Sequence, residues 1–161
     1  MRYAPLLALG GIIAAPASAA ADTITVILPK LRVAEYHNPY FALWVEPTGG
    51  GTARTLAIWY SQKKGGNEPG TKWLSNLRAW WRKGGRSLAL PADGVSGATR
   101  APGSYTIPLP ADLKAGDYTL YVEAARETGG RELLSLPIAV PAKGGSVSGK
   151  SELGTITLSA R

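Results

Sequence analysis

The sequence predicts an all-β fold, an antiparallel Ig-like β-sandwich with one short inserted helix. Three observations lead to this prediction. Short segments rich in β-branched and aromatic residues alternate along the chain with Gly-, Pro- and Asp-rich turns. The hydrophobic period changes from that of a strand to that of a helix only once, between the early and the late strands. No internal repeat and no long linker divides the chain, so we expect a single domain.

The strand pattern recurs in segments that end at turn residues. In the second segment Tyr40 and Trp44 are expected on one face, and Phe41 and Leu43 on the other, because successive side chains of a strand point to opposite faces. Trp44 and Trp59 lie within strands and are expected in the core. The expected strands are residues 24–28, 40–46, 54–61, 105–109, 118–124, 132–140 and 152–159.

The single helix is expected over residues 72–83. Trp73, Leu77, Trp80 and Trp81 stand at i, i+4, i+7 and i+8, which is one face of a helix, and two glycines follow at positions 84 and 85. Trp80 and Trp81 are neighbours in sequence and cannot both be equally buried. Residues 91–103 have turn chemistry throughout, and the Gly- and Ser-rich residues 143–150 are expected to be mobile.

The N-terminus predicts export. Arg2 precedes an apolar run at positions 4–15, Pro16 breaks the run, and Ala17-Ser18-Ala19 supplies a signal-peptidase site. We therefore expect a signal peptide at residues 1–19 and a mature domain at 20–161, located in the periplasm or otherwise outside the cytoplasm. The alternative is an uncleaved anchor, but the run is too short to span a bilayer comfortably. We expect no membrane-spanning segment in the mature chain.

Composition excludes several classes of function. The chain has no cysteine, which rules out disulfides, thiolate metal sites and a cysteine nucleophile. A net charge of +7 suits a phosphate group or an anionic membrane surface, or it serves solubility alone. Nucleic acid is not expected as a partner, because no binding motif is present in this exported chain.

His37 is the only histidine, and no HxH or HExxH spacing exists, so no metal site is expected. The residue types of a Ser-His-Asp triad are present, with His37 as the possible base, but the chain has no G-x-S-x-G motif of the kind that positions a nucleophilic serine. We expect no catalytic residue, and we interpret His37 as a structural or ligand-contacting side chain.

One short segment carries a more specific signal. Asp93, Ser96, Gly97, Ala98 and Thr99 match the pattern D-x-x-[ST]-G-A-[ST]. The pattern resembles the flavinylation motif on which exported bacterial proteins receive covalent FMN. The alternative is an ordinary turn, since D-G and S-G are turn dipeptides.

The resemblance implies a defined chemistry. A flavin transferase uses FAD and Mg²⁺, the hydroxyl of Thr99 attacks the pyrophosphate, AMP leaves, and FMN remains joined by a phosphodiester. The small residues Gly97 and Ala98 would let a flexible, exposed turn carry Thr99 into the narrow active site of the transferase. Asp93 would bind backbone donors or the transferase, Arg100 would pair with the phosphodiester, and Ser96 is the rival acceptor. In many flavin-carrying domains an apolar residue follows the acceptor, whereas Arg100 follows it here.

A second resemblance covers nearly the whole mature chain. The order of motifs is similar to that of the exported DUF2271 family. This implies an uncharacterised protein encoded near flavin transferases and PepSY-type membrane reductases, and hence extracytoplasmic electron transfer, with iron reduction as one candidate role. The motifs that carry it are residues 35–37, 39–40, 44–46, 54–59, 72–74, 80–81, 96–103, 116–119, 122–127 and 129–133.

Six further side chains are candidate contacts for a flavin or a redox partner. The tryptophans among them have an alternative place in the core, and the arginines an alternative role in surface ion pairs. The candidates are His37, Tyr40, Trp80, Trp81, Arg126 and Arg131.

Three hypotheses of function follow. The first is a carrier of electrons with FMN on Thr99, working between a PepSY-type membrane reductase and an acceptor in the envelope. The second is a cofactor-free periplasmic binding or accessory module with an Ig-like fold. The third is a hydrolase that uses His37.

The precursor is expected to be cleaved between Ala19 and Ala21, because the small residues of the A-x-A site follow the apolar run directly. N-terminal sequencing of the periplasmic protein measures the position of the cut. A mature chain that still begins at Met1 would contradict the prediction.

Overall fold

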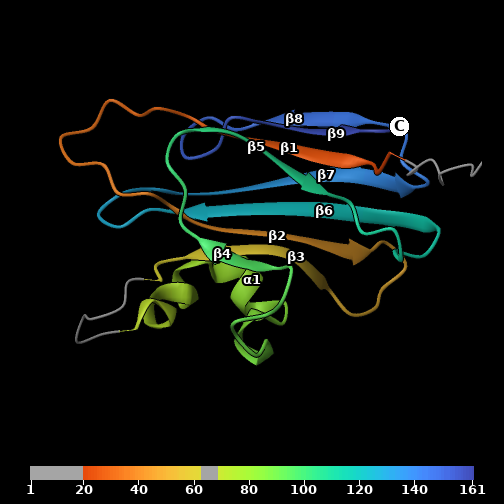
Figure 1. Cartoon of the computed structure of the whole chain (residues 1–161), viewed down its shortest axis with the longest axis horizontal. Coiled ribbons are helices and arrows are strands. Elements are labelled where there is room, and N and C mark those ends of the chain that lie inside the picture. Colours follow the sequence, from red (N-terminus) through yellow and green to blue (C-terminus); the bar gives the residue numbers. More distant parts are fainter. Residues whose placement is uncertain (1–19, 63–68) are drawn as a thin grey trace, which may run out of the picture.

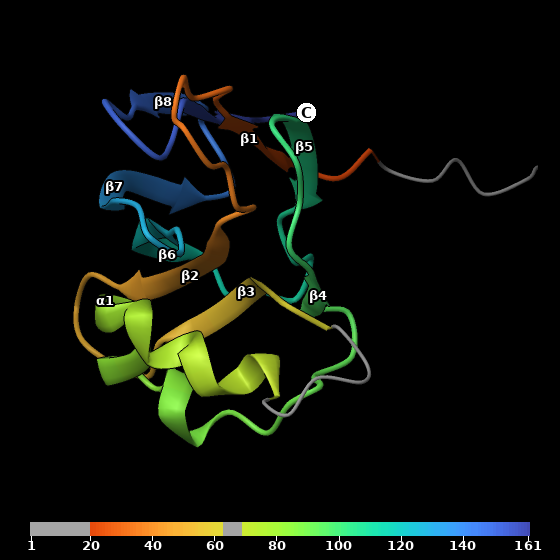
Figure 2. The same cartoon turned by 90° about the vertical axis from the view of Figure 1, so that its left-hand side faces the viewer.

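The chain folds into three layers, two sheets and a helical layer. The computed structural model describes residues 20–62 and 69–161, so the predicted signal peptide lies outside the described residues. The first sheet has the order β5-β1-β9-β8 and the second β4-β3-β2-β6-β7. Figure 2 shows the helices beneath the second sheet. This confirms the prediction of a mostly β, two-sheet sandwich.

The bounds of the elements follow the expected segments closely. In the first sheet they are β1 Thr23–Leu28, β5 Gly103–Pro108, β8 Gly145–Ser148 and β9 Thr155–Ser159. In the second they are β2 Tyr40–Pro47, β3 Arg54–Tyr60, β4 Ser96–Ala98, β6 Gly116–Ala125 and β7 Arg131–Val140. The helical layer consists of η1 Gly70–Asn76, α1 Arg78–Arg82 and η2 Gly85–Ser87.

The central strands β2 and β3 of the second sheet are buried on both faces, and this explains the distribution of its tryptophans. Phe41 and Trp59 face the first sheet, where their rings stack with centroids 4.1 Å apart. Trp44 faces the helices and stacks on Tyr121 at 5.2 Å. Trp44 is 1% exposed and Trp59 2%, so the prediction that both are core residues is confirmed. The alternation expected along β2 therefore separates two cores rather than a core from solvent.

The single helix expected over residues 72–83 is wrong in detail. Leu77 has φ −78° and ψ 72°, which is not helical, and it divides a 3₁₀ segment from α1. Because the helical phase changes there, Leu74 rather than Trp73 packs beneath the sheet, and Trp73 is 48% exposed. Trp80 is buried and Trp81 only partly buried, as their adjacency required.

Two segments read as turns contain strands. Residues 145–148 form β8 and pair with β9, so the mobile segment expected at 143–150 is partly a sheet edge. Within the turn-rich residues 91–103, β4 pairs with β3. Both strands are only three or four residues long, and their glycines and serines are typical of turns, so no alternating pattern marks them.

The pairing of β4 with β3 is parallel, whereas every other strand pair found within the described residues is antiparallel. The C-terminal ends of β3, β4 and β6 consequently lie at the same end of the sheet as the start of β2. Residues that directly follow β4 are therefore brought beside residues that precede β2 and follow β6.

A buried carboxylate attaches the helical layer to the sheet. Glu123 of β6 is fully buried and faces the helices. It accepts hydrogen bonds from the backbone N–H groups of Ala79, at 3.1 Å, and Trp80, at 2.9 Å, and its charge is paired with Arg131 of β7. The residue before α1 is Leu77, which cannot cap a helix, so Glu123 supplies the acceptor that the first turn lacks.

No helix among residues 20–62 and 69–161 has the length and hydropathy needed to cross a bilayer.

Replacing Glu123 by Ala is expected to lower the free energy of unfolding by about 3–5 kcal/mol, because Arg131 loses its partner and the N–H groups of α1 their acceptor. Urea unfolding measures the loss. Asp112→Asn breaks the ion pair with Arg54, whose two side chains are 44% and 74% exposed, and serves as the control with a much smaller effect. Equal losses in the two variants would contradict the role given to Glu123.

Candidate functional site

A cavity of about 630 Å³ opens at the end of the second sheet where β2 begins and β3, β4 and β6 end. This volume lies within the range typical of small-molecule sites. Aromatic, polar and charged side chains share its wall. The lining residues are Tyr36, His37, Asn38, Tyr40, Ser61, Gly70, Trp73, Asn76, Thr99, Ala125, Arg126, Glu127 and Thr128.

Thr99 belongs to this wall, directly after β4. Its backbone N–H donates to the carbonyl of Tyr60 at 3.3 Å, which continues the pairing with β3. The side chain is partly exposed, and its hydroxyl has no hydrogen-bond partner in the part of the chain that the structure describes. The predicted acceptor is therefore a free hydroxyl on a fixed backbone at the edge of a cavity.

The rest of the motif is more ordered than a flexible turn. Ser96 and Gly97 are paired with Ile58 and Trp59 of β3, so the flexible, exposed turn expected there is limited to the residues around Gly94. The hydroxyl of Ser96 accepts a hydrogen bond from the N–H of Ala92 at 2.9 Å. This contact makes Ser96 a poorer rival acceptor than Thr99, because its oxygen is already engaged.

Gly97 packs closely against β3. A Cβ on Gly97 would lie 3.1 Å from Cδ1 of Trp59, which is tighter than ordinary van der Waals contact. Ala98 and Asp93 are exposed. The carboxylate of Asp93 makes no hydrogen bond to a backbone donor among the described residues, so of its two expected roles only contact with a transferase is left to test.

Arg100 lies on aromatic rings. Its guanidinium is 4.2 Å from the centroid of Trp59 and 4.9 Å from that of Tyr105. These contacts with the edge of the core hold an exposed cation next to Thr99. Arg100 follows Thr99 in the chain, but its guanidinium lies on Trp59 and Tyr105 and it does not line the cavity.

Tyr40 and Gly70 join the sheet to the helical layer at the cavity. The hydroxyl of Tyr40 donates to the carbonyl of Gly70 at 2.7 Å. Burial raises the pKa of Tyr40, so the phenol remains a donor at neutral pH. A Cβ on Gly70 would overlap the carbonyl oxygen of Ser61, so only glycine lets η1 begin this close to the end of β3.

His37 lies between two carboxylates. Its Nε2 is 3.1 Å from Oε1 of Glu35, and its Nδ1 is 3.8 Å from Oε2 of Glu127. Both acidic side chains are about three-quarters exposed. No hydroxyl among the described residues is hydrogen bonded to the imidazole, so the base–nucleophile pair that a hydrolase needs is not assembled here. The described residues also contain no group of three or more side chains suited to a metal ion.

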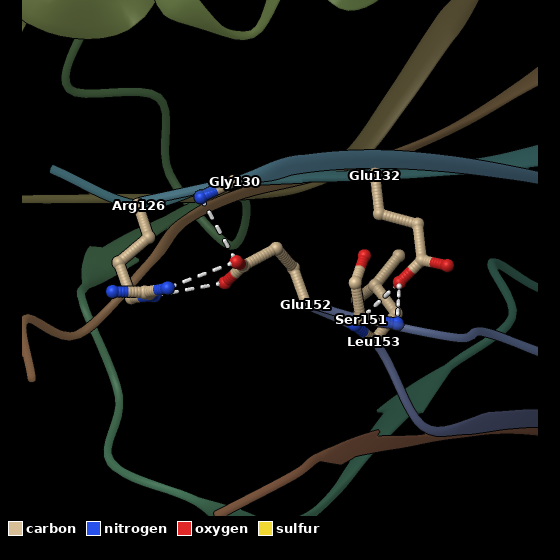
Figure 3. A network of polar contacts seen from close by, with 6 residues as sticks. All are labelled: Arg126, Gly130, Glu132, Ser151, Glu152 and Leu153. Atoms are coloured by element: carbon tan, nitrogen blue, oxygen red, sulfur yellow. Dashed lines mark hydrogen bonds and ion pairs between the residues drawn. The ribbon is translucent and has the colours of Figure 1, made fainter. Parts of the chain in front are cut away.

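A polar network joins the two sheets (Figure 3), and its Arg126 also lines the cavity. Arg126, after β6, binds both carboxylate oxygens of Glu152, at 3.0 and 3.1 Å, and both side chains are less than a tenth exposed. Gly130 donates its N–H to the same carboxylate. The Glu152 hydrogen bond raises the pKa of Arg126 further, so its charge is permanent. The ring of Tyr36 lies 5.9 Å from this guanidinium.

The structure gathers four of the predicted residues and separates the others. Thr99, His37, Tyr40 and Arg126 come from three segments distant in sequence and line one cavity. Trp80, Trp81 and Arg131 do not line it. Trp80 is buried and donates its Nε1–H to the hydroxyl of Thr55. Trp81 packs at the edge of the core between the second sheet and the helices, and Arg131 forms an ion pair with Glu123.

The candidate contacts chosen from the sequence left out several side chains of the wall, chiefly Trp73, Tyr36 and Glu127. Trp73 was assigned to the buried face of a continuous helix, and the break at Leu77 moved it to the cavity. Tyr36 and Glu127 stand in a loop and a hairpin turn, where no periodicity marks a lining residue. The only signal for them was their place beside His37 and Arg126 in the chain.

Together the fold and the cavity define a two-sheet β domain with a mixed aromatic and polar site at one end. The chain belongs to the DUF2271 family, described as a predicted periplasmic protein, whose model matches residues 21–155. The protein is accordingly periplasmic, as its N-terminus predicted. No curated protein and no solved structure shows a significant match to the chain.

The network of Figure 3 makes a pH-dependent contribution to stability. Burial raises the pKa of Glu132, but the N–H groups of Lys150, Leu153 and Ser151 outweigh this effect and hold the pKa below its ordinary value. A carboxylate with a depressed pKa stabilises the fold above its unfolded pKa, and this stabilisation disappears as the pH falls through the folded pKa.

Glu132→Gln is therefore expected to cost about 1 kcal/mol at neutral pH and almost nothing in strong acid. Urea unfolding followed from about pH 7 to about pH 3 measures the difference. Glu127→Gln is the control, because that exposed carboxylate accepts no backbone N–H among the described residues. A cost that stays constant with pH would rule out the carboxylate as the source.

Proposed function

We propose that this periplasmic protein is an electron carrier with FMN joined covalently to Thr99. The observation that supports the proposal most directly is the position of Thr99, whose hydroxyl is free of hydrogen bonds among the described residues and which lines a cavity large enough for a small molecule. When attached, FMN supplies reversible uptake and release of electrons, which no side chain of this chain provides.

The proposed attachment needs a flavin transferase and its FAD. The Thr99 oxygen attacks the FMN phosphorus, the bond from this phosphorus to the oxygen of AMP breaks, AMP leaves, and the hydroxyl proton passes to the transferase. Within the described sheet β4 is an edge strand paired only with β3, so its outer side is the edge that we propose a second protein approaches. Arg100 lies next in the chain and would attract the negative charge of the new phosphodiester.

The proposed partners for electron transfer are a PepSY-type membrane reductase as donor and an acceptor in the envelope. Exposed cations on the helical layer favour a negatively charged surface on such a partner. Arg78, Arg82 and Arg86 are exposed there, and Lys83 is paired with Glu46. Attractive charges of this kind accelerate encounter without fixing a particular complex.

Protein produced together with an active flavin transferase is expected to gain the mass of FMN less water and to fluoresce in a denaturing gel. Thr99→Ala should abolish the label, because no other hydroxyl is free at that position, and Thr99→Ser should retain part of it. Asp93→Ala should weaken labelling, since Asp93 is exposed and has no internal hydrogen bond to lose within the described residues.

Ser96→Ala is the matched control and should keep the label, with peptide mapping to show which residue carries it. Wild-type protein that stays colourless beside a transferase active on another substrate would reject the proposal. The cofactor-free binding module would then be the better description of the cavity.

A further inference from the structure

We propose that the cavity is the seat of the isoalloxazine ring of FMN, with Trp73 as the side chain on which the ring stacks. This inference rests on the attachment proposed at Thr99 and adds the location of the ring. An FMN joined to a threonine can equally well extend into solvent, so the position of the ring is a separate question with a separate test.

The attachment point already lies within the wall of the cavity. Thr99 lines it together with Tyr40 and Ala125, the residues at which β2 begins and β6 ends. The parallel pairing of β4 with β3 produces this arrangement. A ribityl phosphate chain on Thr99 would therefore start inside the wall and would need no path across the protein surface.

Trp73 is the side chain best suited to stack on a planar ring. It is 48% exposed, and only two other large hydrophobic side chains among the described residues, Val33 and Leu133, are comparably exposed. Trp73 is also the one of these three that lines the cavity. Nζ of Lys72 lies 5.1 Å from the centroid of this indole, so a flavin ring stacked on the opposite face would cover apolar surface that the fold leaves in water.

The remaining wall matches the two edges of the isoalloxazine ring. That ring has an apolar benzenoid edge and a pyrimidine edge with carbonyl and N–H groups. The cavity presents aromatic carbon from Tyr36 and Tyr40, and donors and acceptors from Asn38, Asn76 and His37. Tyr40 is held in place by its bond to Gly70, so part of this wall is preformed.

The charges of the cavity favour a neutral ring over a phosphate. Among the described residues of the wall, Arg126 is the only arginine or lysine, and both carboxylate oxygens of Glu152 already occupy its guanidinium. Glu127 in the wall and Glu35 beside His37 add negative charge. The anionic phosphate stays at the rim, where it is bonded to Thr99 and where Arg100 follows in the chain, while the uncharged ring enters.

The test compares Trp73→Ala with Trp81→Ala in FMN-labelled protein. Trp81 belongs to the same helical layer but does not line the cavity, and Trp73 belongs to neither core, so its loss should leave the fold intact. Contact with an indole quenches flavin fluorescence, so the folded wild-type protein should be dim and should brighten on unfolding. Trp73→Ala should lower the ratio of seated to free ring about tenfold, the size expected for one lost aromatic stack.

Folded Trp73→Ala protein should accordingly be brighter and should lose visible circular dichroism of the flavin, whereas Trp81→Ala should resemble the wild type. If the folded, labelled wild-type protein has the fluorescence and the visible circular dichroism of free FMN, then the ring does not bind in the cavity. That result would leave the proposed attachment at Thr99 intact.

A second measurement is independent of the transferase. Thr99→Ala protein keeps the cavity, so titration with free riboflavin should quench its tryptophan fluorescence, and Trp73→Ala in that background should weaken binding about tenfold. If the protein carries no covalent label but binds riboflavin, attachment at Thr99 is rejected and binding of the flavin ring in the cavity is retained. Absence of riboflavin binding together with a solvent-like attached flavin would reject the seat.

Discussion

The buried carboxylate of Glu123 is the constraint on which the helical layer depends. A strand of the central sheet supplies the acceptor for the first turn of α1, and Arg131 of the next strand compensates the charge. The helical layer begins at Gly70, so the cavity wall formed by Trp73 and Asn76 belongs to the same layer that Glu123 attaches. A buried charge that does not itself line the cavity thus supports one side of it.

A second constraint is topological. Antiparallel pairing is the rule in the described sheets, and under that rule the residues after β4 would emerge at the opposite end of the sheet. The parallel pairing with β3 reverses this direction and places Thr99 beside His37, Tyr40 and Arg126. The three residues of β4 therefore connect the cavity to the sheet. The hydrogen bonds of this short strand with β3 fix the backbone position of Thr99.

The long strands could be predicted because alternation is a local property. The pattern of β2 identified both of its faces, and Trp44 and Trp59 were correctly placed in the core. β4 and β8 could not be predicted, since their glycines and serines have turn propensity and only pairing with a distant strand makes them extended. The break at Leu77 was equally hidden, because a contact with Glu123 outweighs local helical spacing there. The candidate attachment motif around Thr99 is contiguous in sequence and could therefore be recognised. The residues that surround Thr99 in the cavity come from four segments distant in sequence, so they could not be predicted.

The dependence of β4 on β3 has a consequence for the order of maturation. Three residues cannot form a strand alone, so the backbone geometry at Thr99 exists only once the sheet has assembled. A chain exported in an unfolded form would acquire it in the periplasm, and with no cysteine it would need no oxidative folding step there. Any enzyme that recognises this geometry would therefore act on the finished domain, and assembly of the sheet would serve as a checkpoint before modification.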